Sequence, residues 1–448
     1  MKPLRIAVLN LSETERDPRV RRVSAALGAA GHQVVAINPL SAGREPRSSG
    51  EGFDIVRVST LSAAEERKLS DELAHSPVLG PLLHSLDPLL RFSLRERIQH
   101  GLQRRLTRGI NRVARRTGLD LGRAQSLVAR AEVDALREAA RLRWTVLGGL
   151  PLFAEALKHR PDLVWCNDTN TLLPGLALKE ATGARLVFDA HEAFTEQLPP
   201  GEVPSSTLAA WARLEAAVLP HTDARSTVCD AVGRFYQERY GAGPFATIRN
   251  VPSLRFLVEP SVLGRRNSPR VAIYQGAYFR FRGLEPTIEA AKYLRRTELH
   301  LRGVGEYEVE LKKLAAQHGV EDRVRFLPAV KVDELAAAAS HADIGLNLFP
   351  SLCLNTSFAL PNKFFEYLLG GLATASSDLV ELRAHTERYG TGVLLPSLEP
   401  TAIAEHLDAL SADSERLDEY RAAAWNAAKT ELHWEKEVAK LSALMESL

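Results

Sequence analysis

A lysine and a glutamate stand three positions apart near the start of an expected helix in the second half of the chain. Residues 359–367 read ALPNKFFEY. Pro361 occupies a position that proline favours at a helix N-terminus, where free backbone N–H groups can bind an anion. About one turn further on, Glu366 could accept two hydrogen bonds from a ribose diol, as acidic residues do in dinucleotide sites. The alternative is that Lys363 and Glu366 form a solvent-exposed ion pair.

A second group of residues suited to phosphate follows an expected strand over residues 270–275. Gly276 ends this strand, and Arg280 and Arg282 precede the next helix. Glycine lets the backbone approach a phosphate closely, and an arginine can hold two phosphate oxygens. Glycine after a first strand is also a common tight turn, so this signal alone leaves both interpretations open.

The first half of the chain offers a histidine after an expected strand over residues 184–189. His191 is flanked by Asp189 and Glu192. An imidazole there could hydrogen-bond a sugar hydroxyl or take a proton. The alternative is a structural histidine whose hydrogen bonds are satisfied within the fold.

Asn167 and Asp168 end another expected strand, over residues 162–166. Ligands of parallel sheets bind outside the carboxyl ends of the strands, so this pair could face an acceptor molecule. The two residues could equally cap the helix that is expected from Thr171.

Metal chemistry has no signature in the sequence. No Asp-x-Asp motif stands at a strand end, and no histidines have the spacing of metal ligands. The three cysteines, Cys166, Cys229 and Cys353, are too far apart to indicate a zinc site or a disulfide framework. We therefore expect no metal and no cofactor. Cationic side chains and helix amides would instead stabilise the charge on a leaving group.

The elements that must position these residues are short apolar strands alternating with helical patterns. The first set of strands is expected over residues 4–10, 33–37, 162–166, 184–189 and 224–229. Residues 250–269, rich in Pro, Arg and Ser, interrupt the alternation. It restarts with strands expected over residues 270–275, 298–302, 323–327, 343–348 and 372–375. The sequence thus predicts two Rossmann-like, doubly wound α/β domains facing a cleft.

Length and composition agree with a two-domain globular protein. The chain has 448 residues, of which 45% are hydrophobic and 25% charged. A formal net charge of +2 argues against nucleic acid as a partner. The apolar run at the N-terminus is too short for a signal peptide, and no apolar run is long enough to predict a membrane span. We therefore expect a cytoplasmic protein.

Residues 61–150 break the alternation and predict a helical insertion rich in arginine. Between Arg91 and Arg116, nine arginines stand against one acid, Glu96. Apolar residues recur there at i, i+4, which predicts a basic amphipathic helix over residues 91–116. Either this helix packs on the first domain, or it makes a peripheral contact with anionic lipid at the inner face of a membrane.

Several short segments share a resemblance to one family. They are residues 17–22 (DPRVRR), 31–34 (GHQV), 188–192 (FDAHE), 362–367 (NKFFEY), 377–379 (SDL) and 433–435 (HWE), together with Gly371. These segments resemble glycosyltransferase family 4, whose members have the GT-B fold. The resemblance covers nearly the whole chain except about residues 61–150. It implies a retaining transfer of a sugar from a nucleoside diphosphate sugar.

The same resemblance implies roles for individual residues. Glu366 would bind the donor ribose, Arg282 would neutralise the diphosphate, and His191 would lie against the transferred sugar. Lys363 is the third catalytic candidate. The other donor-site candidates are Gly276, Arg280, Asn362 and Val330, and Val330 would act through backbone groups near the base. The acceptor-site candidates are Arg19, Asn167 and Asp168. Two departures are Phe358, where the family commonly has a glutamate, and residues 12–16 (SETER), which replace a glycine-rich turn.

We expect an acceptor-binding domain over residues 1–255, a donor-binding domain over 265–413, and C-terminal helices over 414–448 that pack back on the first domain. The predicted activity is transfer of a sugar to a hydroxyl of a glycan, a lipid-linked acceptor or a small molecule. One alternative is a sugar-nucleotide epimerase or hydrolase of the same fold. The other is a catalytically inactive scaffold protein that binds a sugar nucleotide, which Phe358 favours.

Overall fold

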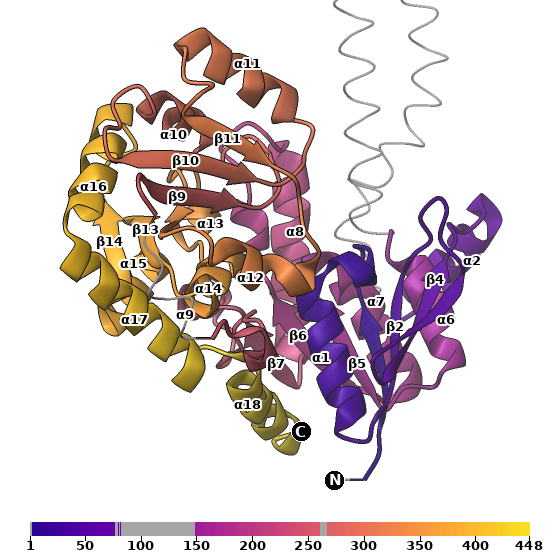
Figure 1. Ribbon diagram of the computed structural model, residues 1–448. Coiled ribbons are helices and arrows are strands. Elements are labelled where there is room, and N and C mark those ends of the chain that lie inside the picture. Colours follow the sequence, from indigo (N-terminus) through magenta and orange to yellow (C-terminus); the bar gives the residue numbers. More distant parts are fainter. Residues whose placement is uncertain (1, 77–78, 80, 82–147, 260–266) are drawn as a thin grey trace, which may run out of the picture.

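The computed structural model describes residues 2–76, 79, 81, 148–259 and 267–448. The expected basic helix over residues 91–116 lies outside this part of the chain. Helices α2 (Ala63–Ala74) and α6 (Leu150–Lys158) stand on either side of the gap. The described residues form two α/β domains side by side (Figure 1).

The first domain is built on an eight-stranded sheet with the order β3-β4-β2-β1-β5-β6-β7-β8. The paired strands are parallel except for β3 with β4. The strands are β1 (Arg5–Leu9), β2 (Gln33–Pro39), β3 (Arg47–Gly50), β4 (Phe53–Val58), β5 (Leu163–Asn167), β6 (Arg185–Ala190), β7 (Ala224–Thr227) and β8 (Ala246–Thr247). The β1 strand, Arg5 aside, and all of β5 are buried, as a parallel sheet with both faces covered requires.

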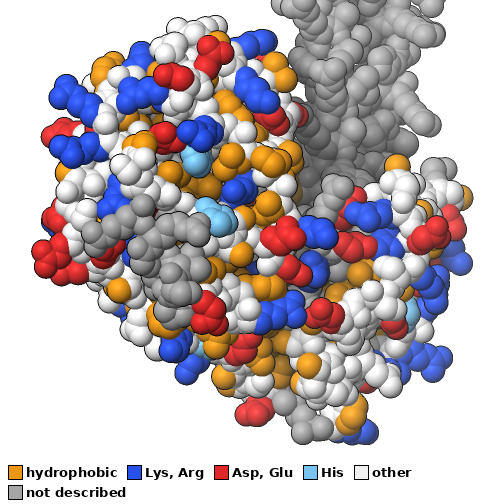
Figure 2. All heavy atoms as spheres, in the orientation of Figure 1, with side chains coloured by type: hydrophobic (Ala, Val, Ile, Leu, Met, Phe, Trp, Pro, Cys, Tyr) orange, Lys and Arg blue, Asp and Glu red, His pale blue; other side chains and the backbone are white. Residues whose placement is uncertain are grey.

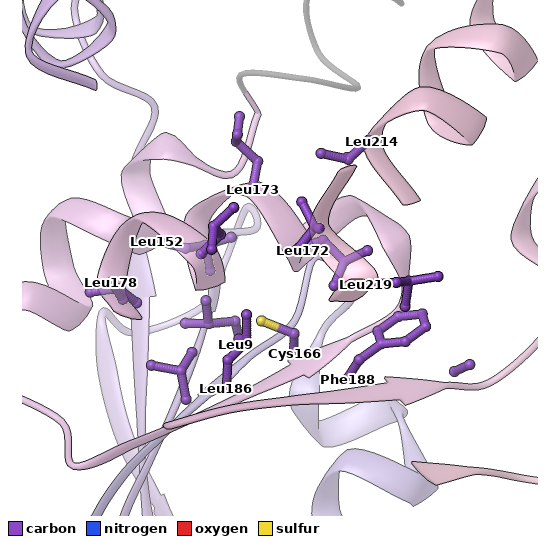
Figure 3. Packing of buried hydrophobic residues seen from close by; sticks show 14 of the residues in the cluster. Leu9, Leu152, Cys166, Leu172, Leu173, Leu178, Leu186, Phe188, Leu214 and Leu219 are labelled. Atoms are coloured by element: carbon purple, nitrogen blue, oxygen red, sulfur yellow. The ribbon is translucent and has the colours of Figure 1, made fainter. Parts of the chain in front are cut away.

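Successive residues of β1 enter different cores. Ala7 and Leu9 pack in the cluster that α6, α7 (Leu172–Thr182) and α8 (Ser205–Val218) cover, part of which Figure 3 shows. Ile6 and Val8 point the other way and pack against α1 (Pro18–Ala29). This alternation is the two-residue period of a strand that is buried on both faces.

The second domain is built on a six-stranded parallel sheet with the order β11-β10-β9-β12-β13-β14. Its strands are β9 (Arg270–Gln275), β10 (Thr297–Arg302), β11 (Val324–Leu327), β12 (Ile344–Asn347), β13 (Ala373–Ser377) and β14 (Gly392–Leu395). Its helices include α10 (Leu284–Ala290), α11 (Glu308–His318), α12 (Leu335–Ala339), α13 (Leu354–Ser357), α14 (Asn362–Leu369), α15 (Val380–Tyr389) and α16 (Pro400–Ala412). The prediction of two doubly wound domains is confirmed.

The last two helices belong to different domains. Helix α17 (Ser414–Thr430) packs in the second domain, where Arg421 Nε donates a hydrogen bond to the Gly371 carbonyl at 3.0 Å. Helix α18 (Trp434–Glu446) places Leu441 and Met445 in the core beside α1 of the first domain. This corrects the expectation that both C-terminal helices pack on the first domain.

Candidate active site

The carboxyl ends of the two sheets carry the polar residues that the sequence singled out. In the second domain the relevant strand is β9, which ends at Gln275, and helix α14 begins nearby at Asn362. In the first domain, β5 ends at Asn167 and β6 at Ala190. Ligands of doubly wound sheets bind outside these strand ends.

Helix α14 provides an N-terminus without a side-chain cap. Pro361 precedes it in an extended conformation and has no side chain that could cap the first amides. Phe364, Phe365 and Leu368 on its inner face are buried in a core shared with α17. This packing fixes the direction of α14, so that Asn362 and Lys363 form its first turn. Such a helix start suits an anion.

Lys363 is a buried basic residue at this helix start. Its Nζ lies 3.5 Å from the centre of the Tyr274 ring and 5.2 Å from that of Phe349. Within the described part of the chain, its Nζ makes no hydrogen bond or ion pair. Burial, helped by the charge of Arg282, holds the pKa of Lys363 well below its usual range. An anion bound at Nζ would stabilise the protonated form.

Two further predicted residues lie beside Lys363. The guanidinium of Arg282 lies 5.6 Å from the centre of the Phe349 ring, so both cations flank one aromatic side chain. Gly276 has a φ of +146°, and a Cβ there would stand 3.3 Å from Lys363 Nζ. The structure therefore places Gly276 and Arg282 near Lys363, a set of groups whose types suit phosphate oxygens.

Glu366 lies one turn further into α14, half-buried at the cleft. Its Oε2 accepts a hydrogen bond from Gln275 Nε2 at 3.1 Å, and Arg302 Nη1 donates to the other end of that amide at 3.3 Å. Burial raises the pKa of Glu366, whereas the Gln275 hydrogen bond and the charges of Lys363 and Arg22 oppose this shift. Among the described residues, no hydrogen bond reaches its second oxygen, and the ribose contact stays a prediction.

For three other donor-site candidates the structure shows no side-chain hydrogen bond or ion pair with Lys363, Arg282 or Glu366 among the described residues. Arg280 is exposed and stacks over the neighbouring Phe281 ring, 5.2 Å from its centre. Asn362 is half-buried at the first position of α14. Val330 is half-buried in the loop that follows β11. These positions leave their predicted donor contacts as expectations.

On the first domain, His191 is surrounded by oxygen atoms. Its Nε2 lies 3.1 Å from Asn167 Oδ1 and 3.5 Å from a carboxylate oxygen of Asp189, and its Nδ1 lies 3.4 Å from Asp168 Oδ2. Burial lowers the pKa of this imidazole, but the two carboxylates outweigh it and raise the pKa to about 9. His191 is thus a cation at neutral pH. A proton-accepting role, one of the two predicted for it, does not fit this state.

Asn167 and Asp168 both contact His191, but only Asn167 is withdrawn from the surface. Asn167 is fully buried, and its Nδ2 donates to the Leu9 carbonyl at 2.9 Å. Asp168 has a φ of +59°, and its Oδ1 accepts the His191 backbone N–H at 2.8 Å. Burial of Asn167 contradicts its predicted contact with an acceptor. Asp168 keeps partial exposure, and a non-glycine residue in this backbone region often marks a functional site.

Arg19 is buried, which contradicts its predicted contact with an acceptor. Its Nε and Nη2 donate to the two carboxylate oxygens of Asp189 at 2.8 and 2.5 Å, and Nη1 donates to the Ile248 carbonyl. Only 1% of its surface is exposed. Arg19 therefore keeps Asp189 ionised, and Asp189 in turn acts on His191.

Phe358, which stands where the family commonly has a glutamate, has a packing role in this structure. Phe358 packs against the core of the first domain, together with Leu360, so this segment joins the two domains. Asn355 lies in the same segment; its Oδ1 accepts the Ala193 N–H at 3.0 Å, and its Nδ2 donates to Glu192 at 3.1 Å. The segment before α14 is thus held against the strand end that carries His191.

Comparisons with known proteins agree with this architecture. Residues 269–413 match the family described as "Glycosyl transferases group 1", and residues 96–253 match the "Glycosyl transferase 4-like domain". Together the two segments cover more than half of the chain. The chain is a family 4-like glycosyltransferase. A search among curated proteins finds no match.

Solved structures show the same fold over nearly the whole glycosyltransferase. Sucrose-phosphate synthase from Thermosynechococcus elongatus has 14% identity and a TM-score of 0.67, over 99% of this chain and 98% of that one. HepE from Anabaena, in complex with UDP and glucose, has 13% identity and a TM-score of 0.63, over 99% and 100%. WaaG, a glycosyltransferase involved in lipopolysaccharide biosynthesis, has 14% identity and a TM-score of 0.56, over 98% of each. The predicted GT-B fold is confirmed.

Sequence reasoning missed several residues of this glycosyltransferase. Burial, helped by Asp168, raises the pKa of Glu192 to about 7, and its Oε2 bonds Asn355 of the other domain. Arg22 lies close enough to Glu366 for their charges to interact, and its Nη1 donates to Asn250. No local motif predicts these contacts, because the partners lie far apart in the sequence.

Arg22 also lines a pocket of about 690 Å³ where the two domains of the glycosyltransferase meet. Arg21 and Arg255 share this pocket with acidic residues, and Figure 2 shows basic and acidic side chains side by side at this junction. Val332 and Asp333, which follow the loop expected near the base, complete its wall. The pocket thus lies beside the segment that we expect to contact the base.

In the part of the chain that the structure describes, no group of three His, Cys, Asp or Glu residues could hold a metal ion. None of the described helices is long and apolar enough to cross a membrane.

Proposed function

We propose that this glycosyltransferase uses a UDP-sugar as donor and moves its sugar to a hydroxyl group. The observation that carries this proposal is the position of Lys363 and Arg282 beside Gly276 at the uncapped start of α14. The charge of Arg282 makes protonation of Lys363 costly, and a bound diphosphate would offset that repulsion. Structures of HepE with UDP and with UDP-glucose support uridine as the base.

The chemistry follows from where the charges lie. As the bond between the sugar C1 and the phosphate oxygen breaks, Lys363 and Arg282 would stabilise the negative charge that grows on the diphosphate. Glu366 would hold the ribose hydroxyls and thereby fix the phosphates in this position. These residues need no movement during the reaction, which is the usual basis of electrostatic catalysis.

We propose that the anomeric configuration is retained. His191 is already protonated, so it is unsuited to accept the proton of the incoming hydroxyl. A phosphate oxygen of the leaving diphosphate would accept that proton while the hydroxyl oxygen bonds to C1 on the same face. The anomeric proton coupling of the product, read by NMR, tests this; inversion would instead favour Glu192 as the base.

Two alternative functions remain testable in the same assay. A hydrolase or epimerase would consume the donor at the same rate with or without an acceptor. An inactive scaffold would bind the donor without consuming it. The proposed activity requires that a panel of hydroxylated acceptors accelerates UDP release, with EDTA present to test the expected independence of metal ions.

A further inference from the structure

A small apolar pocket lies between the two domains. It has a volume of about 220 Å³, and both domains contribute to its walls. The first domain supplies the loop after β6 and part of α8, including Phe194, Leu198 and Trp211. The second domain supplies Leu352 and Leu354 from the segment before α14.

This pocket continues the site that holds His191 and Glu192. Its first wall begins at Phe194, two residues after Glu192. Its second wall includes Cys353, whose Sγ lies 3.4 Å from the Gln197 carbonyl and joins the walls. Asn355, next to Leu354, bonds both Glu192 and Ala193. A molecule seated in the pocket would therefore lie beside Glu192 and Asn355.

The rim of the pocket is unusually apolar for an exposed surface. Leu198 is 47% exposed, and Leu352 and Leu354 across from it are 40% and 41% exposed. Deeper in, the Phe194 and Trp211 rings pack edge to face with their centres 4.6 Å apart. Single exposed leucines are ordinary, but three around one cavity mark a surface that binds an apolar group.

Charge and size narrow the choice of occupant. Among the described residues that line the pocket, Glu196 is the charged one, and it pairs with Arg239 at 2.8 Å. Because Glu196 is paired, the described lining of the pocket favours an uncharged, apolar group. At roughly 30 Å³ for each water-sized group, the cavity holds about seven methylene-sized groups.

We propose that this pocket binds an apolar group, of about seven carbons, next to the acceptor's reacting hydroxyl. The inference rests on the proposed transfer to a hydroxyl, and it assigns the acceptor to hydroxylated compounds with an uncharged apolar portion. Desolvation of Leu198, Leu352 and Leu354 by that portion supplies the affinity. The hydroxyl then lies toward Glu192 and Asn355.

Straight-chain alkan-1-ols from ethanol to octanol serve as probes for this pocket, with binding followed by ligand-observed NMR. Affinity should rise about fourfold per added methylene and level off once the chain fills the cavity. The double variant Leu198→Asn/Leu354→Asn should lose this dependence on chain length. The matched control is Val309→Asn, because Val309 is 61% exposed on α11, outside the pocket, and it should behave as the wild type.

An affinity that does not change with chain length would overturn the proposal, as would an equal dependence in the double variant. UDP binding by the same proteins separates this proposal from the proposed function. If the alcohols bind as expected while UDP does not, the donor assignment fails and the apolar pocket stands. If UDP binds to all three proteins and the alcohols show no dependence on chain length, only the pocket assignment fails.

Discussion

The Nζ of Lys363 lies 3.5 Å from the centre of the Tyr274 ring. The ring face attracts the cation without neutralising it. Lys363 is therefore held ready for an anion, at the cost of a lowered pKa. The same burial that lowers the pKa of Lys363 also strengthens its attraction to a bound anion.

This arrangement predicts that UDP binding takes up a proton. Because bound diphosphate raises the pKa of Lys363, affinity should fall as the pH rises above roughly 7.5, where the diphosphate itself is fully ionised. Calorimetry in two buffers of different ionisation heat measures the uptake. Lys363→Met should bind UDP more weakly, with no uptake. Equal heats in both buffers for the wild type would show that Lys363 is protonated before binding.

His191 predicts an unusual pH profile. Asp168 and Asp189 overcome the effect of burial and raise its pKa to about 9, so kcat/KM should fall as the pH rises through about 9. The protonated His191 also stabilises the folded protein. This contribution is fully present below pH 6.5, the ordinary pKa of histidine, and is lost as the pH rises through about 9. His191→Gln should abolish the high-pH fall. A rate that increases with pH near 6.5 in the wild type, and not in this variant, would identify His191 as a base.

The buried pair of Arg19 and Asp189 predicts a loss of stability rather than of acceptor affinity. Arg19→Ala leaves a buried carboxylate without its partner, which typically costs about 3–5 kcal/mol. Thermal unfolding measures the effect. Arg5→Ala is the matched control, because Arg5 makes the same two-pronged contact with Asp162 at the surface and its loss should change the melting temperature little. Similar melting temperatures for both variants would contradict this role.

The sequence predicted the strands that hold the site, because buried parallel strands are continuous apolar runs. Strand β9 was expected over residues 270–275 and is found as Arg270–Gln275. Strand β3 could not be predicted, since Arg47–Gly50 is polar and exposed and carries no apolar pattern.

Some residues of the candidate site could also be predicted from sequence, and others could not. Lys363 and Glu366 could be predicted from sequence because one helix carries both and a proline marks its start. The burial of Arg19 could not be predicted from sequence, because its partner Asp189 is 170 residues away along the chain. Asn355 shows the same limit, since its bond to Glu192 exists only when the two domains meet.

Glu366 predicts the strength of donor binding. Its second oxygen would accept a charge-assisted hydrogen bond, worth about 1.5–3 kcal/mol, from the ribose. Glu366→Ala should therefore raise the donor KM at least tenfold, while the protein stays folded. Glu387→Ala, an exposed change on α15, is the control for altered charge. Donor kinetics equal to the wild type in Glu366→Ala would remove this residue from the site.

Calorimetric titration of UDP, with GDP, ADP and dTDP alongside and EDTA present, tests the central claim most directly. The wild type should bind UDP, and Arg282→Ala should weaken binding by about ten- to a hundredfold, as loss of a charged hydrogen bond predicts. Arg295→Ala, an exposed arginine elsewhere in the same domain, should leave binding unchanged. Failure of the wild type to bind any of these nucleotides, or equal affinity in Arg282→Ala, would contradict the account.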